Sequence, residues 1–362
     1  MEMAGEAATL RRGRAEVMLA ALAYASSVPV AKTLLRDVSP LALSGGIYLA
    51  AGGVLGLLWL VSTLRAPGSR KTTIRGSEWA WLGGAVMAGG VLAPVLLFLG
   101  LRLVQGHVAG LLLNFETVFT LMLGAALYGE RLGRLGWIGA TCVIAGAALL
   151  SLPAGGEGTL GPARLRGAFF VVAACALWGL DNNLTQRVSL RDARQIVAVK
   201  GLAGGATNLV LALALGQLGG ISPGAWAATA LVGAVAYGFS IVLFVRGLRT
   251  LGVIQTGTLF ALAPGFAAVL SLVFLHEPLG VAGVAALGIM TAGGLLLAHD
   301  VHAHPHVHEA MAHAHAHIHD AHHRHTHTPG EPAATPHAHE HRHKPLVHAH
   351  PHAHDIHHRH RH

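Results

Sequence analysis

Seven charged or amide side chains stand inside otherwise apolar stretches of this 362-residue chain. Ionisable groups at membrane depth are costly, so they mark sites for substrates, ions or protons. A carboxylate such as Glu116 can bind a cation or carry a coupling proton, whereas an ammonium such as Lys32 can bind a substrate carboxylate. The candidate substrate-binding residues are Lys32, Asn114, Glu116, Asp181, Asn182, Asn183 and Lys200.

Each candidate also has a structural interpretation. Lys32 can extend its side chain to the membrane interface beside Arg36. Lys200 can neutralise Asp181 or Glu116 instead of binding a ligand. The sequence leaves these alternatives open.

The polar run at residues 181–183 cannot all face lipid. On a helix, Asn182 shares a face with Gln186, while Asp181 points about 100° away. We therefore expect at least two of these polar groups to face a cavity or another helix.

A second kind of chemistry is concentrated from residue 299 onward, where 64 residues contain 25 of the 27 histidines. The repeating unit is X-His, and imidazole suits Zn, Cu and Ni. The apolar content is too low for a core, so we expect disorder without metal. The alternatives are a polar extension without a metal role and a pH sensor. The candidate metal ligands are His302, His304, His306, His308, His313, His315, His317 and His319.

The elements that position these residues are membrane helices. Of the residues, 53% are hydrophobic and only 12% are charged, and apolar runs of about 20 residues recur up to residue 298. The ten predicted spans are 16–36, 41–63, 79–99, 104–127, 134–152, 167–187, 195–215, 225–245, 253–275 and 279–298. Glycine spacing such as Gly52/Gly56 and Gly201/Gly205 indicates close helix packing.

The spans form a repeat with an offset of 147 residues. The stretch 100–150 matches 247–297, including the pairs Arg102/Arg249 and Glu130/Glu277. We interpret these charged pairs at loop ends as devices that fix the fold and orientation. His107, near the start of its span, is interpreted as an interface residue.

Lysine and arginine are distributed unequally between the loops. With a cytoplasmic N-terminus, fourteen of them fall in inside segments and four in outside segments, so we expect both termini in the cytoplasm. Five spans per repeat then give the two halves opposite orientations. This is the inverted-repeat plan of secondary transporters, which predicts a substrate site between the halves near the bilayer midplane.

Two loop motifs carry a family resemblance. The stretch Leu127-Tyr-Gly-Glu130-Arg-Leu-Gly133 resembles the end of an EamA domain, and Phe274-Leu-His-Glu277-Pro-Leu-Gly280 resembles a second one. The chain thus resembles the drug/metabolite transporter superfamily over residues 16–298. The family pattern often has a proline in the fourth span of each repeat; Pro264 supplies it, but Thr117 stands at the aligned place. The resemblance implies a permease without an ATPase module, and does not imply one substrate.

These observations predict an all-α membrane protein with ten transmembrane helices in two inverted five-helix repeats. Its parts are a cytoplasmic segment (1–15), two EamA repeats (16–152 and 153–298) and a disordered cytoplasmic His-rich tail (299–362). We expect a multi-pass protein of the cell membrane, the inner membrane if the source is bacterial. No enzyme activity and no nucleic-acid partner are expected, and homodimerisation stays open.

Three functions are compatible with the sequence. The first is a secondary transporter, expected to be an exporter, that moves a small solute by alternating access and needs no cofactor. The second is an efflux permease for Ni, Co, Zn or Cu, with the tail as the metal collector. The third is a metal buffer or sensor anchored in the membrane, although a ten-span repeat exceeds what an anchor requires.

Overall fold

The computed structural model divides the chain into a helical unit that ends at Asp300 and a second unit from Val301 to Arg361. Each unit is described by itself, and side chains are described in the helical unit alone. The described residues are 2–65, 74, 76–128, 133–150, 161–188, 191, 193–298, 302–308, 312–317, 337–342 and 346–352.

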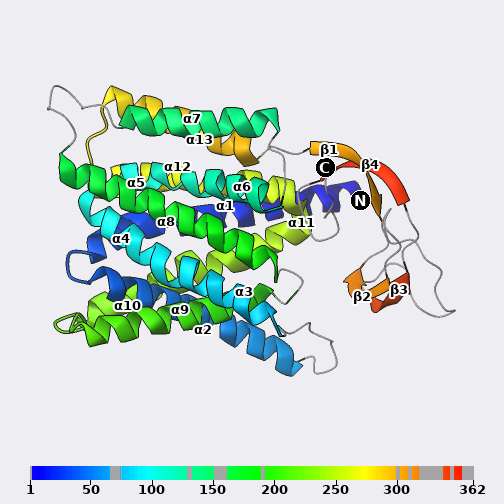
Figure 1. Cartoon of the computed structure of the whole chain (residues 1–362), viewed down its shortest axis with the longest axis horizontal. Helices are drawn as coiled ribbons and strands as arrows, with labels where there is room; N and C mark the ends of the chain where they lie inside the picture. Colours follow the sequence, from blue (N-terminus) through cyan, green and yellow to red (C-terminus); the bar gives the residue numbers. More distant parts are fainter. Residues whose placement is uncertain are drawn as a thin grey trace. The chain divides into compact units, whose positions relative to one another are not determined.

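The helical unit is a bundle of long helices (Figure 1). Its α-helices are α1 (Glu2–Leu34), α2 (Pro40–Arg65), α3 (Glu78–Ala85), α4 (Ala93–Leu103), α5 (Gly106–Leu112), α6 (Phe115–Tyr128), α7 (Arg134–Leu150), α8 (Pro162–Gln186), α9 (Ala193–Ala214), α10 (Pro223–Val232), α11 (Ser240–Phe260), α12 (Ala263–Leu275) and α13 (Val281–Ala298). Two π-helical segments, η1 (Val86–Leu92) and η2 (Gly233–Phe239), connect α3 to α4 and α10 to α11.

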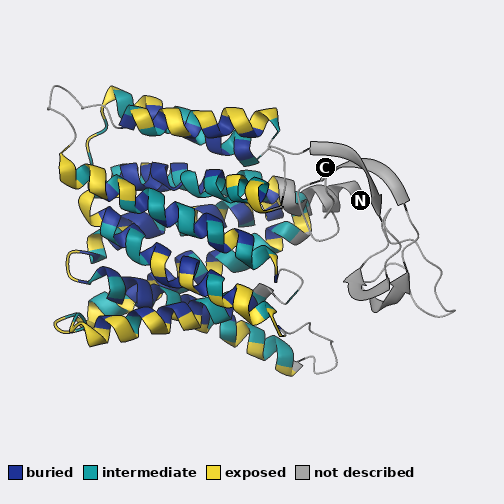
Figure 2. Ribbon diagram, in the orientation of Figure 1, coloured by how far each residue is buried: buried dark blue, intermediate teal, exposed yellow. Residues whose placement is uncertain are grey.

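The helices have the length and composition of membrane spans. Within the described residues, nine stretches are long and apolar enough to cross a membrane, and the 17-residue α7 is a shorter apolar helix. Many exposed side chains of the bundle are large and apolar, among them Leu64, Phe169 and Val281 (Figure 2). Such a surface suits hydrocarbon, so the predicted all-α membrane fold is confirmed.

Helix packing follows the repeat. Helices at equivalent places in the two halves pair directly: α2 with α9, α5 with α12, and α7 with α13. Other contacts are exchanged between the halves. Helix α1 of the first half packs on α11 of the second, and α8, the equivalent of α1, packs on α4, the equivalent of the start of α11. This exchange is expected if the two halves are related by a pseudo-twofold axis.

Glycines allow the α2–α9 pair to approach closely. A Cβ atom at Gly52 would lie 2.5 Å from the backbone nitrogen of Leu202, and one at Gly201 would lie 2.7 Å from the Cα of Gly52. The predicted packing role is therefore confirmed at Gly52 and Gly201. Gly56 is less constrained, since a Cβ there would have ordinary contacts at 3.7 Å.

Two spans in each repeat are irregular, which the sequence analysis did not predict. The π-helical segments η1 and η2 occupy equivalent positions, since their bounds differ by the repeat offset of 147 residues. The fourth span breaks after Leu112, between α5 and α6, and the ninth breaks after Phe260, between α11 and α12. Interrupted helices at membrane depth are tolerated where protein surrounds them or where they line a cavity.

One predicted loop is wrong. Helix α11 continues from Ser240 to Phe260 through the place where spans 225–245 and 253–275 were separated. This stretch contains no proline, so no missing N–H or ring clash ends the helix there.

The tail was expected to be disordered, and its described residues instead form short strands. Strand β1 (His302–His308) pairs antiparallel with β4 (Leu346–His352), and β2 (Ala312–His317) pairs with β3 (His337–Arg342). Low apolar content argued against a core, but the X-His alternation has the period of two that a strand requires. The register places histidine opposite histidine at His302↔His352, His304↔His350, His306↔His348, His313↔His341, His315↔His339 and His317↔His337.

Candidate substrate site

Glu116 stands in the first turn of α6, directly after the break that ends α5. Its Oε1 accepts a hydrogen bond from Asn182 Nδ2 on α8 at 3.1 Å. The same nitrogen donates to Thr120 Oγ1, one turn further along α6, at 3.1 Å. Because α6 and α8 belong to different repeats, the predicted interface between the halves passes through this pair.

Asp181 points to a different helix from its neighbour Asn182. Lys200 Nζ on α9 lies 2.6 Å from Asp181 Oδ1 and 2.7 Å from Oδ2, and it also donates to Thr185 Oγ1 at 3.2 Å. Asp181 and Asn182 therefore face two different helices, α9 and α6. Lys200 therefore forms its ion pair with Asp181, one of the two carboxylates considered for it.

The π-helical segment η1 packs against this ion pair at Gly89. A Cβ atom at Gly89 would overlap the carboxylate of Asp181, so only glycine fits there. The carbonyl oxygen of Gly89 accepts hydrogen bonds from Tyr48 Oη at 3.0 Å and from Trp178 Nε1 at 3.1 Å. The π-helical turn therefore joins the ion pair to the aromatic side chains beside it.

Four rings form an aromatic cluster, which we define as Tyr24, Tyr48, Tyr237 and Phe260. The Tyr24 and Tyr237 ring centroids are 5.5 Å apart, the Tyr48 and Tyr237 centroids 5.8 Å, and the Tyr24 and Phe260 centroids 5.6 Å. Every ring of the cluster is half-buried. Glu116 is within electrostatic range of all three tyrosines. The cluster shows no local sequence pattern, because its rings come from α1, α2, η2 and α11.

Two predicted site residues stabilise helix backbone instead of meeting Glu116. Asn114 donates from Nδ2 to the carbonyl of Leu111 at 2.9 Å and is buried. Asn183 donates from Nδ2 to the carbonyls of Gly179 at 2.8 Å and Thr120 at 3.0 Å. The bond from Asn183 to Thr120 joins α8 to α6, whereas the other two bonds lie within one span.

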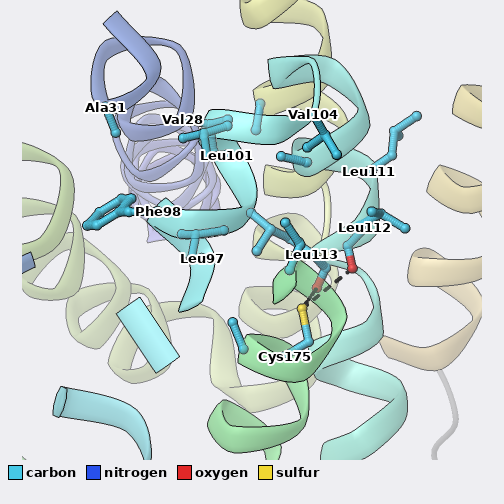
Figure 3. Close-up of a cluster of buried hydrophobic side chains, with 14 of the residues drawn as sticks. Val28, Ala31, Leu97, Phe98, Leu101, Val104, Leu111, Leu112, Leu113 and Cys175 are labelled. Atoms are coloured by element: carbon cyan, nitrogen blue, oxygen red, sulfur yellow. Dashed lines mark hydrogen bonds between the residues drawn. The ribbon is translucent and has the colours of Figure 1, made fainter. Parts of the chain in front are cut away.

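Cys175 contacts the backbone at the break between α5 and α6. Its thiol lies 3.5 Å from the carbonyl oxygen of Leu112 and 4.0 Å from that of Leu113 (Figure 3). Carbonyls at a helix end lack an intrahelical partner. The thiol from α8 thus supports the broken helix that presents Glu116.

Lys32 lies away from Glu116. Its Nζ donates to the carbonyl of Leu101 at 2.9 Å and also to that of Val104, at the C-terminal end of α4. Arg102 on α4 in turn donates to the carbonyls of Leu35 and Val38 after α1, at 3.2 and 3.1 Å. Each cation thus compensates carbonyls at the end of the other helix, a structural role for Lys32 that the sequence did not predict.

One polar contact links the repeats where the fourth span begins, and we call it the His107–Glu277 latch. Glu277 Oε2 is 2.8 Å from His107 Nδ1 and accepts from its backbone N–H at 3.0 Å, while Oε1 accepts from Gly106 N at 2.7 Å. Burial raises the pKa of Glu277, but these hydrogen bonds outweigh burial and hold the pKa below its ordinary value. His107 and Glu277 had been interpreted separately, and their pairing was missed.

A second contact links the repeats where the third span begins, the Glu78–Arg191 latch. Arg191 Nη2 lies 2.7 Å from Glu78 Oε1, and Nε lies 3.0 and 2.9 Å from the two carboxylate oxygens. The hydrogen bonds to Glu78 raise the pKa of Arg191. Consecutive spans run in opposite directions, so the two latches lie at opposite membrane faces.

The described part of the helical unit was considered for metal ligands. No group of three or more His, Cys, Asp or Glu suited to a metal occurs among the residues described. Of the predicted tail ligands, those from His302 to His317 lie in β1 and β2, of which the backbone is described. His319 lies outside the described residues.

Comparisons with known proteins agree with this architecture. The EamA-like transporter family matches residues 13–152 and 165–298. An uncharacterized transporter of Methanothermobacter thermautotrophicus is 27% identical over 307 residues, covering 81% of this chain and 88% of the relative. An uncharacterized protein of Pseudomonas aeruginosa is 31% identical over 272 residues, covering 74% and 88%.

A solved crystal structure shares the fold, with a TM-score of 0.56 and 21% identity, over 77% of this chain and 94% of that one. The family consists of membrane transporters for small molecules, which are not enzymes and need no cofactor. The chain therefore belongs to the EamA-like transporter family, and it is a multi-pass membrane transporter with two EamA domains.

Proposed function

We propose that this transporter exports a small organic solute by alternating access, with its binding site between the repeats at Glu116. The supporting observation is the Glu116–Asn182 pair beside the aromatic cluster, because it joins both repeats at a broken helix. In this proposal Glu116 and Asn182 contact the solute directly. The Asp181–Lys200 pair fixes the wall next to them.

The two latches would open in turn as the transporter opens towards one membrane face and then the other. In an inverted-repeat transporter, one half moves against the other around a fixed site. Opening towards one face breaks the His107–Glu277 latch, and opening towards the other breaks the Glu78–Arg191 latch. Both contacts cross between repeats, so neither can survive a full movement at its own face.

The expected orientation assigns each latch to one face of the membrane. The excess of lysine and arginine in alternate loops supports cytoplasmic termini. The His107–Glu277 latch would then close the outside, and the Glu78–Arg191 latch would close the cytoplasmic side.

Flux from proteoliposomes tests the proposal. Vesicles with the full-length protein would be loaded with labelled amino acids, nucleosides and organic amines, and efflux followed by mass spectrometry. We expect one class to leave faster than from empty vesicles, and Glu116→Gln to lose most of this flux. Glu16→Gln is the matched control, because Glu16 pairs with exposed Arg12 outside the site. Equal flux from wild type and Glu116→Gln would contradict the assignment.

A second candidate function belongs to the tail, which we propose binds a divalent metal such as Zn, Ni, Co or Cu. The observation that favours it is the register, which sets histidines opposite one another in both strand pairs. Directly opposed residues of an antiparallel pair have Cβ atoms about 5 Å apart, and imidazole suits these metals.

The metal itself is disfavoured as the transported species. Transition metals prefer several nitrogen or sulfur ligands. Near Glu116 the second carboxylate, Asp181, is held by Lys200, and Cys175 lies against helix carbonyls.

Metal content and flux separate the two candidates. The full chain and a chain ending at residue 300 would each be purified and dialysed against zinc, and bound metal measured by mass spectrometry. We expect zinc in the full chain alone and unchanged solute flux in both. Zinc in the shortened chain would contradict the tail as the binding segment.

A further inference from the structure

Resting on the proposed site, we infer that the solute is an organic monocation, an amine or quaternary ammonium compound with an apolar or aromatic body. Among the described residues at membrane depth, Lys32 and Lys200 are bonded to other groups and Glu116 has no cation against it. Tilted aromatic rings stand within electrostatic range of Glu116.

The described lysines at membrane depth cannot hold an anion. Lys200 directs its ammonium to both oxygens of Asp181 and to Thr185, at 2.6, 2.7 and 3.2 Å. An ammonium has three N–H donors, so this arrangement uses them all. Lys32 donates to two backbone carbonyls at the end of α4. A carboxylate or phosphate substrate would have to break one of these sets.

Glu116 keeps acceptor capacity for a cation. An ionised carboxylate has about four lone-pair sites, and a neutral donor, Asn182, occupies one at 3.1 Å. The nearby cation Lys200 is within electrostatic range of Glu116 but is bonded to Asp181. A carboxylate without a cation is unfavourable at membrane depth, and a cationic solute would supply the missing charge.

The aromatic cluster offers ring faces more than hydroxyl groups. Tyr48 donates its hydroxyl to the carbonyl of Gly89, and Tyr237 is hydrogen-bonded to Ser27. Neighbouring rings are inclined by 69° between Tyr24 and Tyr237, 45° between Tyr48 and Tyr237, and 42° between Tyr24 and Phe260. Aromatic faces within electrostatic range of a negative group can hold ammonium ions through cation–π interactions.

Three probes of similar shape and different charge test the class. These are phenethyltrimethylammonium, phenylacetamide and phenylacetate. Binding to the full-length protein in lipid nanodiscs would be measured by calorimetry near neutral pH. We expect the cation to bind about tenfold or more tightly than the other two, and Glu116→Gln to remove about tenfold of that affinity.

Matched variants identify the groups responsible. We expect Tyr24→Phe to retain the affinity for the cation and Tyr24→Leu to lower it several-fold, because only the second removes a ring. Glu16→Gln should bind like the wild type. Tighter binding of phenylacetate, or unchanged cation binding in a Glu116→Gln variant with wild-type thermal stability, would overturn the inference.

Flux measurements distinguish this inference from the proposed function. Efflux of an anionic or neutral probe, with no binding of the cation, would retain the transporter site and overturn the solute class. Glu116-dependent binding of the cation without flux would retain the class and contradict transport through this site.

Discussion

Glu277 and His107 are joined across the two repeats by both side chain and backbone. The carboxylate lies 2.8 Å from the imidazole Nδ1 and accepts the backbone N–H of the same residue at 3.0 Å. Glu277 thereby completes the start of α5, the helix that ends at the break before Glu116.

Removal of this carboxylate should destabilise the protein. Glu277→Ala leaves two backbone N–H groups and the imidazole without their acceptor, so we expect a loss of roughly 1.5–3 kcal/mol. Thermal unfolding in detergent measures the effect. His276→Ala, one residue earlier and outside these bonds, serves as the control; equal losses in both variants would show that the latch contributes little.

The latch should also respond to acid. The pKa of Glu277 is lowered in the folded protein, so its stabilisation is present above the unfolded carboxyl pKa and is lost as pH falls through the lowered value. Lys32 is within electrostatic range and favours the ionised carboxylate as well. We expect the difference in melting temperature between wild type and Glu277→Gln to be large near about pH 7 and to shrink below about pH 4. A constant difference over this range would contradict the assignment.

The Asp181–Lys200 pair should behave as a unit. Lys200→Met alone leaves a buried carboxylate uncompensated, and we expect a loss of about 3–5 kcal/mol. The double variant Asp181→Asn/Lys200→Met removes both charges and should recover most of that stability. Unfolding of the wild type, both single variants and the double variant gives the coupling energy. Additive losses would mean that the two residues act independently.

Adjacent glycines in α2 provide a matched test of helix packing. Gly52→Ala would bring a methyl group to 2.5 Å from the backbone of α9, whereas a Cβ at Gly53 meets nothing within 4 Å. We expect Gly52→Ala to lower stability by about 1–3 kcal/mol and Gly53→Ala to be neutral or slightly stabilising. Similar melting temperatures for the two variants would contradict the close α2–α9 contact.

Cross-linking tests the latches as gates. In a chain with Cys142 and Cys175 replaced by serine, the pair Glu78→Cys/Arg191→Cys would be joined by a short bismaleimide. We expect solute flux to fall to the background of empty vesicles, while each single-cysteine variant treated in the same way retains its flux. The same should hold for His107→Cys/Glu277→Cys. Full flux in a cross-linked protein would show that the corresponding latch does not open.

The membrane fold could be predicted from the sequence because the apolar runs and the internal repeat each extend over most of the helical unit. Apolar runs predicted the spans, and the aligned pair Glu130/Glu277 indicated the repeat. Helix periodicity also predicted that neighbouring polar side chains point in different directions, and Asp181 and Asn182 do face different helices. These inferences need only helix periodicity and the cost of polar groups in lipid.

The site itself required the three-dimensional structure. Lys32 had the charge of a ligand-binding residue, but the carbonyls it meets are 69 and 72 residues away in the chain. The tyrosines beside Glu116 are ordinary apolar-span residues until packing brings α1, α2 and η2 together. Composition and spacing therefore predicted Glu116 as a candidate but could not predict which residues surround it.

The two π-helical segments have the same winding but different sequences. Val86–Leu92 reads VMAGGVL and Gly233–Phe239 reads GAVAYGF, and the aligned stretches share no residue at any of the seven positions. Both nevertheless keep the same unusual winding at the same place. The same backbone shape is thus formed by two sequences that differ at every aligned position. A search for distant members of this architecture would do better to compare local helix winding than to align these residues.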